Sequence, residues 1–154
     1  MYPIQLNLTN KQIVIIGGGK IAYRKLMKIL KEDACSVMII SKKFLPQFFE
    51  IEHSNVKLLT KCYDKNDIKN ASLIIAATDD PKVNDQIKKD AKAHQLVNHT
   101  SDQLQSDFFN MLEIEFEDIK ICLRSNGNDC VKVKRISQAV QTYLTEVYKE
   151  EKHD

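Results

Sequence analysis

The sequence predicts an α/β fold: a parallel sheet with helices on both faces, followed by a small antiparallel β segment and a C-terminal helix. Two observations support this prediction. Short apolar runs alternate with helical patterns over about the first hundred residues, as in sheets covered on both faces. From residue 106 onward the pattern changes to two extended segments and one amphipathic stretch. We therefore expect a domain at 1–105 and a shorter segment at 106–154.

The apolar runs predict the strands. Alternating apolar and polar residues at 2–8 predict a short, half-buried strand. Buried strands are predicted from continuous runs at 12–16, 35–40, 56–59, 73–77 and 96–98. Beyond the sheet, 108–116 and 119–124 are predicted to pair antiparallel around Glu117-Asp118.

Apolar residues at helical spacing predict the helices. These are expected at 20–31, 44–53, 81–93 and 131–149, with a turn or short helix at 64–70. Asp79 or Asp80 is expected to cap the helix that starts at Pro81. The terminal helix either closes the domain or pairs with a second subunit, and a homodimer is expected.

Composition favours a cytoplasmic globular protein. The 154 residues suffice for one domain with a real core, and a net charge of +2 favours neither nucleic acid nor membranes as partners. No apolar segment approaches the roughly 20 residues of a membrane span. The N-terminus also lacks the pattern of a signal peptide.

The four cysteines indicate neither a metal site nor a disulfide framework. They form no CxxC pair, and no histidine lies beside them at ligand spacing. We expect reduced thiols that mostly fill the core. The residues concerned are Cys35, Cys62, Cys122 and Cys130.

Three consecutive glycines end the run at 12–16, and a helical pattern begins at once. The stretch Gly17-x-Gly19-x-x-Ala22 is typical of the turn that seats a dinucleotide pyrophosphate in a Rossmann-like sheet. Gly17 is expected to make the tight turn, and Gly19 to let the backbone approach the phosphates. Ala22 lets the helix pack close to the strand. The helix dipole and its first N–H groups then face the anion.

The end of the second strand leaves the cofactor type open. Sheets that prefer NAD often place an acidic residue there, where it binds the ribose hydroxyls. This chain has Ser41, followed by Lys42 and Lys43. A serine can still hydrogen-bond a ribose, whereas two lysines suit a 2′-phosphate. This segment therefore allows NAD or NADP.

Taken in order, these motifs resemble the siroheme synthase N-terminal family, the NAD-dependent precorrin-2 dehydrogenases that make sirohydrochlorin. The resemblance covers residues 2 to 140, and the matching pieces are 3–8, 17–25, 76–81 with Asn84, 96–98 and 125–127. It implies oxidation of precorrin-2 in siroheme biosynthesis, with hydride transfer to NAD⁺. Some family members also insert ferrous iron into the product, and members are commonly dimers.

The resemblance also implies cofactor-binding residues in three places. The glycine turn would line the pyrophosphate, the end of the second strand would lie near the adenosine ribose, and the block after the fourth buried run would lie near the nicotinamide. Asn84 and Asn98 are expected to hold backbone and loops together. The implied cofactor-binding residues are Gly17, Gly19, Lys20, Ile21, Ala22, Ser41, Lys42, Ala77, Thr78 and Asp79.

The catalytic position departs from the family pattern. Many members carry a catalytic aspartate where this chain has Ser101, and a serine is no base unaided. Either Asp102 supplies the carboxylate, or His99 does the proton work, or no strong base is needed and cofactor placement dominates. Asp102 and His99 are also the only local pair for iron, and no resident metal site is expected.

A second departure follows the last predicted strand. Ser125 and Gly127 match the family, but the Ser-Pro pair that follows in the family is missing, and 106–154 is shorter than the C-terminal part of longer members. Candidates for binding the substrate carboxylates are Arg124, Ser125 and Lys132, although a solvated helix start is the alternative. The departures leave open a chelatase-only or degenerate paralogue, or a non-catalytic NAD(H)-sensing module.

Overall fold

The computed structural model describes residues 2–32, 36–126 and 129–147. Within it the chain divides into two compact units, Met1–Phe108 and Phe109–Asp154, which are described separately. No helix in the described ranges is long and apolar enough to cross a membrane.

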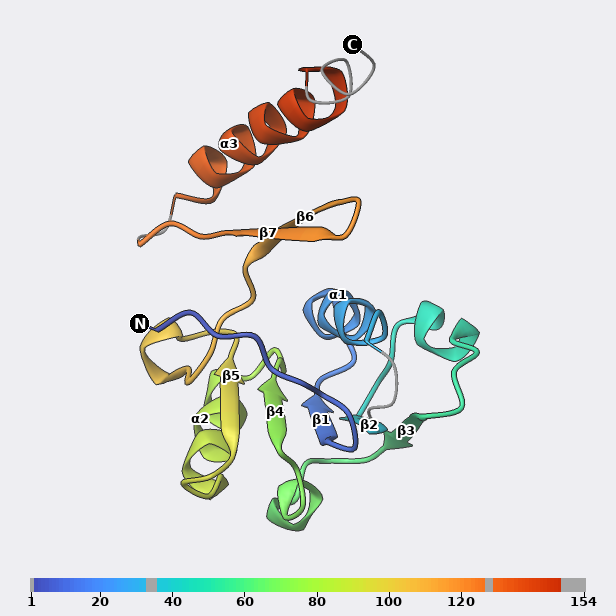
Figure 1. The fold of residues 1–154 in the computed structure, drawn as a ribbon. Helices are drawn as coiled ribbons and strands as arrows, with labels where there is room; N and C mark the ends of the chain where they lie inside the picture. The colour runs from blue at the N-terminus through green and yellow to red at the C-terminus, as the bar shows by residue number, and fades with distance from the viewer. Residues whose placement is uncertain (1, 33–35, 127–128, 148–154) are drawn as a thin grey trace. The chain divides into compact units, whose positions relative to one another are not determined.

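The first unit is built on a five-stranded parallel sheet with the order β3-β2-β1-β4-β5, seen from right to left in Figure 1. The chain enters at the central strand, moves outward to one edge, and then returns to build the other edge. The order thus reverses between β1 and β4, and open α/β sheets bind ligands outside the carboxyl ends of the strands at such a point. The strands are β1 (Gln12–Ile16), β2 (Ser36–Ser41), β3 (Val56–Thr60), β4 (Leu73–Ala76) and β5 (Leu96–His99).

Alternate strand residues fill two separate cores, one on each face of the sheet. In β1, Ile15 belongs to one core and Ile16 to the other. The first core includes Leu26 of helix α1, and the second includes Ile87 of helix α2. This confirms the predicted parallel sheet with helices on both faces. The helical elements of the unit are α1 (Lys20–Ile29), α2 (Pro81–Asp90) and the 3₁₀ turns η1 (Pro46–Glu50), η2 (Lys65–Ile68) and η3 (Gln103–Gln105).

The predicted N-terminal strand at 2–8 is wrong, because this segment pairs with no strand. Its alternation instead reflects packing: Leu6 and Leu8 rest against the first core, while the residues between and before them are exposed. Pro3 also lacks the N–H that a sheet ladder needs.

The helix predicted at 44–53 is reduced to the single turn η1. Leu45 is extended, with φ −67° and ψ 147°, because a following proline disfavours the helical region for the residue before it. The apolar pattern serves instead to bury Phe48, whose ring packs edge-on to Tyr23 with centroids 5.2 Å apart.

Helix α2 ends at Asp90, earlier than the predicted 93, because Ala91 is extended with ψ 140°. The chain is diverted there by Gln95, whose Oε1 accepts from the backbone N–H of Lys92 at 2.8 Å. The start of the helix follows the prediction, and Asp80, not Asp79, is the cap.

The second unit contains an antiparallel pair and one helix, as predicted. Strand β6 (Leu112–Phe116) turns at Glu117, where φ is +53°, into β7 (Ile119–Leu123). Helix α3 (Cys130–Thr142) is capped by Asp129 and continues as a π-helical turn at Tyr143–Val147. The predicted loop residues 127–128 and helix residues 148–149 lie outside the described residues.

Three of the cysteines correct a prediction. Cys62, Cys122 and Cys130 are free and exposed, so these thiols do not fill the core. Cys122 belongs to the pair β6–β7, where two strands alone cannot cover both of their faces. Cys35 lies outside the described residues.

Candidate functional site

The glycine turn leaves β1 at the point where the strand order reverses. Gly17 has φ +130°, and a Cβ there would collide with the carbonyl of Ala77 after β4. Its N–H donates to the Ile40 carbonyl of β2 at 2.8 Å, and the Ala77 N–H donates to the Ile16 carbonyl at 2.8 Å. The turn is therefore tied to both neighbouring strands, and only glycine fits at position 17.

Gly18 is a requirement that the motif analysis missed. A Cβ on it would collide with the Lys43 carbonyl and lie 2.8 Å from the Ser41 hydroxyl oxygen. Its own carbonyl accepts from the Leu45 N–H at 3.0 Å, so the loop after β2 packs directly on the turn. The sequence signal that could have identified it is the glycine at position 18 itself, because the motif requires glycine only at positions 17 and 19.

Gly19, by contrast, opens onto empty space. It is the N-cap of α1 with φ −94°, it is exposed, and no atom lies within 4 Å of a Cβ built on it. No side chain caps the helix, and its first turn holds no acidic residue. The first intrahelical bond runs from the Tyr23 N–H to the Gly19 carbonyl at 3.0 Å.

The start of α1 therefore fits a dinucleotide pyrophosphate. The N–H groups of Lys20, Ile21 and Ala22 precede the first residue that can bond within the helix, so they need an outside acceptor. They lie at the positive end of the helix dipole, which favours an anion there. Ala22 is fully buried in the first core, as its small size predicted.

Asn84 organises the block that follows β4. It is 0% exposed, and its Oδ1 accepts from the Thr78 N–H at 3.1 Å and the Thr78 hydroxyl at 2.8 Å. Its Nδ2 donates to the Thr78 carbonyl at 3.2 Å and to the Ser101 hydroxyl oxygen at 2.7 Å. Asn98 likewise donates to the Phe108 carbonyl at 2.8 Å. The prediction that both asparagines hold backbone and loops is confirmed.

Asn84→Asp is expected to destabilise the fold by about 2–4 kcal/mol, because it removes the Nδ2 donor and leaves a buried carboxylate oxygen facing the Thr78 carbonyl. Denaturant unfolding measures the change. The matched control is the same substitution at the exposed Asn70, which should leave stability within about 0.5 kcal/mol of the parent. Equal stability of the two variants would show that the Asn84 bonds are not needed.

Both ring nitrogens of His99 have hydrogen-bond partners within the protein. The residue is 2% exposed, Nδ1 accepts from the Asp102 backbone N–H at 2.9 Å, and Nε2 lies 3.0 Å from the Asp85 carboxylate. Since a backbone N–H only donates, the neutral ring must carry its proton on Nε2 and give it to Asp85. Both nitrogens are therefore used within the protein.

Asp102 is similarly occupied. Hydrogen bonds from the Gln105 side chain, and then from the Leu104 backbone, hold the pKa of its carboxyl below the ordinary value. A lowered pKa makes a carboxylate a weaker base. Asp85 and Gln105 complete this group through a 3.0 Å bond, and no sequence signal identified either of them.

Ser101 follows the carboxyl end of β5, and its hydroxyl, like that of Thr78, is hydrogen-bonded to Asn84. The residue is exposed, and its oxygen accepts from Asn84. The hydroxyl proton therefore points elsewhere and can be donated to a ligand. Asp79 is exposed two residues after the buried Ala77, at the same carboxyl end of β4.

The predicted substrate-binding residues belong to the second unit. The Arg124 guanidinium lies 4.5 Å from the centre of the Phe109 ring, within cation–π distance. The Lys132 backbone N–H donates to the Asp129 carboxylate that caps α3. Their role, with that of Ser125, stays a prediction.

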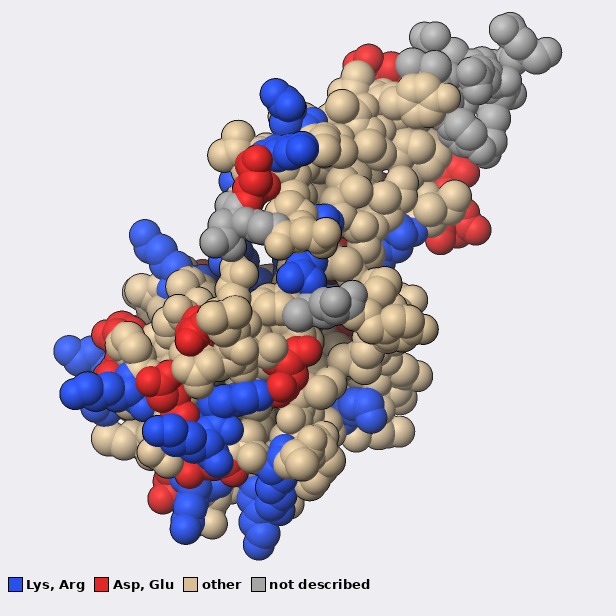
Figure 2. Space-filling model, turned by 90° about the vertical axis from the view of Figure 1, so that its left-hand side faces the viewer, with Lys and Arg blue, Asp and Glu red and all other residues tan. Residues whose placement is uncertain are grey.

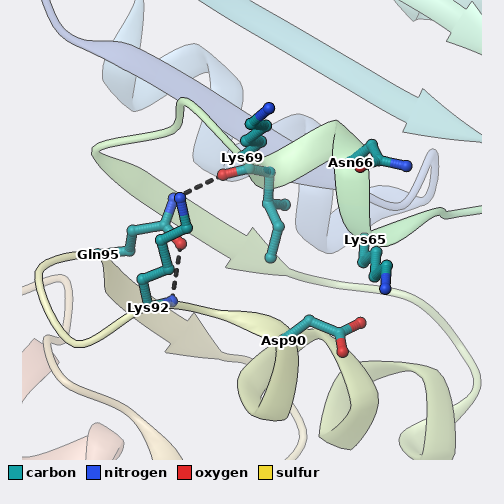
Figure 3. Close-up of a pocket in the computed structure, with 7 residues that line it drawn as sticks. Lys65, Asn66, Lys69, Asp90, Lys92 and Gln95 are labelled. Atoms are coloured by element: carbon teal, nitrogen blue, oxygen red, sulfur yellow. Dashed lines mark hydrogen bonds between the residues drawn. The ribbon is translucent and has the colours of Figure 1, made fainter.

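A hollow of about 240 Å³ lies at the opposite, amino end of the strands (Figure 3). Its lining comes from η2, the end of α2 and the loop before β5, segments that precede β4 and β5 at their amino ends. Gln95, buried there, donates to the carbonyls of Ile68 and Ala71. The lining residues are Lys65, Asn66, Ile68, Lys69, Asp90, Lys92 and Gln95.

Neither the charge on the face in Figure 2 nor the metal-binding side chains among the described residues indicate a further site. On the face shown in Figure 2, lysine and arginine side chains are interspersed with acidic ones, so that face presents no field of one sign. Among the described residues, no three His, Cys, Asp or Glu side chains are grouped to hold a metal ion.

Comparison with known proteins places the chain among relatives. A family model described as NAD(P)-binding matches residues 4–111. Precorrin-2 dehydrogenase from Bacillus subtilis (strain 168) is 30% identical over 145 residues, which cover 94% of this chain and 89% of the relative. A siroheme synthase from Pseudoalteromonas translucida (strain TAC 125) is 33% identical over 144 residues, or 92% of this chain. The chain spans only 30% of that longer relative.

The fold also matches a solved structure. The precorrin-2 dehydrogenase SirC superposes with a TM-score of 0.82 at 24% identity, covering 94% of this chain and 74% of SirC. At that identity the match supports the fold: a Rossmann-like sheet with a following antiparallel pair and helix.

Proposed function

This chain belongs to the family of precorrin-2 dehydrogenases and siroheme synthase N-terminal domains, and from that premise we propose that it oxidises precorrin-2 to sirohydrochlorin with NAD⁺. The observation that carries the proposal is the open start of α1 at Gly19, next to a turn that only glycine permits. Bound NAD⁺ supplies the acceptor for one hydride, and one proton leaves the tetrapyrrole as well. If the chain also inserts ferrous iron into sirohydrochlorin, that iron is a substrate of the reaction and not a resident cofactor.

In this proposal the residues of the chain position the cofactor and the substrate. The N–H groups at 20–22 hold the pyrophosphate, and Ala77, Thr78 and Asp79 lie on the nicotinamide side of the strand-order reversal. The Ser101 hydroxyl oxygen accepts from Asn84, so its proton is available to position the bound ligand through a hydrogen bond. Because His99 and Asp102 are hydrogen-bonded to neighbouring residues, the proton that leaves the tetrapyrrole passes to solvent in this proposal. The rate enhancement then comes from the orientation of the substrate relative to the cofactor.

The second unit completes the enzyme in this proposal. Helix α3 exposes 78% of Val131 and 43% of Ile136, apolar surface that suits a two-fold homodimer interface. Arg124, Lys132 and Ser125 bind carboxylates of the tetrapyrrole. We place this dimer in the cytoplasm, where siroheme biosynthesis would use it.

Purified protein supplied with precorrin-2 and NAD⁺ under anaerobic conditions is expected to form NADH and sirohydrochlorin in equal amounts. Absorbance spectra follow both products, and a reaction without NAD⁺ is the control. Adding ferrous iron to the finished reaction shows whether siroheme also forms. NAD⁺ binding without turnover would overturn the dehydrogenase assignment.

That outcome would favour a second candidate, an NAD(H)-sensing module. The observation behind it is that His99 and Asp102, the two candidate bases, are both held within the protein. A sensor needs the glycine turn but no reactive group beside it.

A further inference from the structure

We propose that Asp85 of α2 is a positioning residue for the hydride transfer. Through His99 and Gln105 it fixes the loop that follows β5, residues 100–105, and this loop presents the Ser101 hydroxyl to the bound ligand. The inference rests on the proposed function and adds a contribution of α2 to the same site. Asp85 lies 14 and 20 residues before these two partners, so no short sequence motif contains the group.

The Asp85 carboxylate bonds to side chains at both ends of this loop. Its Oδ1 lies 3.0 Å from His99 Nε2 and accepts from Gln105 Nε2 at 3.0 Å. His99 is the last residue of β5, and Gln105 is the last residue of η3. Gln105 Nε2 also donates to the Asp102 carboxylate at 3.1 Å. One carboxylate of α2 therefore ties the start of the loop to its end.

The bond to Asp85 also decides which nitrogen of His99 carries the proton. His99 is 2% exposed, so its ring N–H needs an acceptor within the protein, and Asp85 supplies one at Nε2. Nδ1 is then free to accept the backbone N–H of Asp102 at 2.9 Å. With the proton on Nδ1, two N–H groups would face each other and this bond would be lost. Asp85 thus holds the Asp102 backbone through the histidine ring.

Ser101 lies between two residues whose backbones are anchored. Thr100 donates its N–H at 3.0 Å and its hydroxyl at 2.9 Å to the Ala76 carbonyl at the end of β4. Asp102 is held by the histidine ring, and Asn84 donates to the Ser101 oxygen at 2.7 Å. Loss of the bond at Asp102 would release one side of the serine and leave the other contacts in place.

A shift of the serine should affect the reaction more than it affects cofactor binding. In the proposed mechanism the rate depends on orientation, and a displacement of about 1 Å can cost roughly a hundredfold in rate. The pyrophosphate, by contrast, is held by N–H groups of α1, which make no bond to this loop. Loss of the Asp85 bonds is therefore expected to lower kcat while NAD⁺ affinity is retained.

Asp85→Leu and Asp85→Asn form a matched pair, because both are neutral and similar in shape, but only asparagine keeps an oxygen that accepts from His99 and Gln105. With precorrin-2 and NAD⁺, we expect kcat of the leucine variant to fall roughly tenfold or more, while the calorimetric Kd for NAD⁺ stays within about twofold. The asparagine variant should keep kcat within about threefold of the parent. Gln86→Leu, which removes an exposed bond to Asp90 on the same helix, is the control and should change neither quantity.

NMR spectroscopy tests the structural step without turnover. In the parent, the ¹⁵N shifts of the His99 ring should show a protonated Nε2 and an acceptor Nδ1. In Asp85→Leu, the Asp102 amide should exchange its hydrogen with solvent roughly tenfold faster or more. Gln105→Met, which removes the second partner of the carboxylate, is an independent variant and should also lower kcat, by roughly threefold or more.

The outcomes separate this inference from the proposed function. A parent chain without turnover would overturn the proposed function, and this inference with it. With an active parent, an unchanged kcat in Asp85→Leu would overturn the role of Asp85 alone. So would an equal loss of NAD⁺ affinity, which indicates a general structural effect, or an asparagine variant as slow as the leucine variant. If Asp85→Leu does not fold, an unchanged kcat in Gln105→Met overturns the inference.

Discussion

A Gly19→Asp variant is expected to fold at least as stably as the parent chain and yet to lose dinucleotide binding. A Cβ at this position meets no atom within 4 Å, and φ −94° suits any residue. Aspartate is a favoured N-cap and its charge suits the helix dipole, so stability should rise by about 0.5–1 kcal/mol. The same carboxylate takes the N–H groups of the first turn and repels the pyrophosphate. Calorimetric titration should show at least a roughly hundredfold increase in the Kd for NAD⁺.

Gly19→Asn is the matched control, because it has the same shape and capping ability without the charge. We expect it to weaken binding about tenfold, since it competes for the N–H groups but does not repel the phosphates. Thermal unfolding of both variants checks that each is folded. Unchanged binding in the aspartate variant would show that the start of α1 is not the dinucleotide site.

Gly17→Ala should damage the fold itself, with a loss of about 3–5 kcal/mol in the free energy of unfolding. Part of this loss is the strain of an L-residue at φ +130°, and part is the collision of the new Cβ with the Ala77 carbonyl. Such a loss approaches the whole stability of many domains of this size, so much of the protein would be unfolded.

The control for that change is Gly19→Ala, the same addition of one methyl group two residues later. There it enters open space, and stability should stay within about 1 kcal/mol of the parent. Denaturant unfolding compares the two. If both variants were equally stable, the close approach between the turn and β4 would have to be abandoned.

The sheet could be predicted from the sequence because its strands are buried on both faces, which makes runs such as 12–16 continuously apolar. The segment at 2–8 shows the limit of the method. Leu6 and Leu8 alternate with polar residues because they pack on a core, and alternation alone does not reveal whether a segment finds a strand to pair with. The helix predicted at 44–53 is shorter at both ends, because Pro46 keeps Leu45 extended and the chain becomes extended again at Ile51, with φ −78° and ψ 108°.

At the site, the parts contained in one short stretch were predictable. Gly17 and Gly19 lie within one motif, whereas the need for Gly18 arises from Lys43, on a loop after another strand. The state of His99 was equally hidden, because Asp85 lies 14 residues away on α2. Sequence thus identifies groups able to do chemistry, while the fold decides which remain available.

The bonds around the glycine turn also bear on the order of folding. Gly17 is joined to β2 through Ile40 and is shaped by Ala77 after β4, while Gly18 carries the loop after β2. The contacts that hold the turn in the folded structure therefore come from segments as late in the chain as residue 77, well after the motif itself. A dinucleotide consequently binds the assembled sheet and not the unfolded chain, and through mass action it stabilises all three strands at once. Cofactor binding is in this way coupled to the assembly of these three strands.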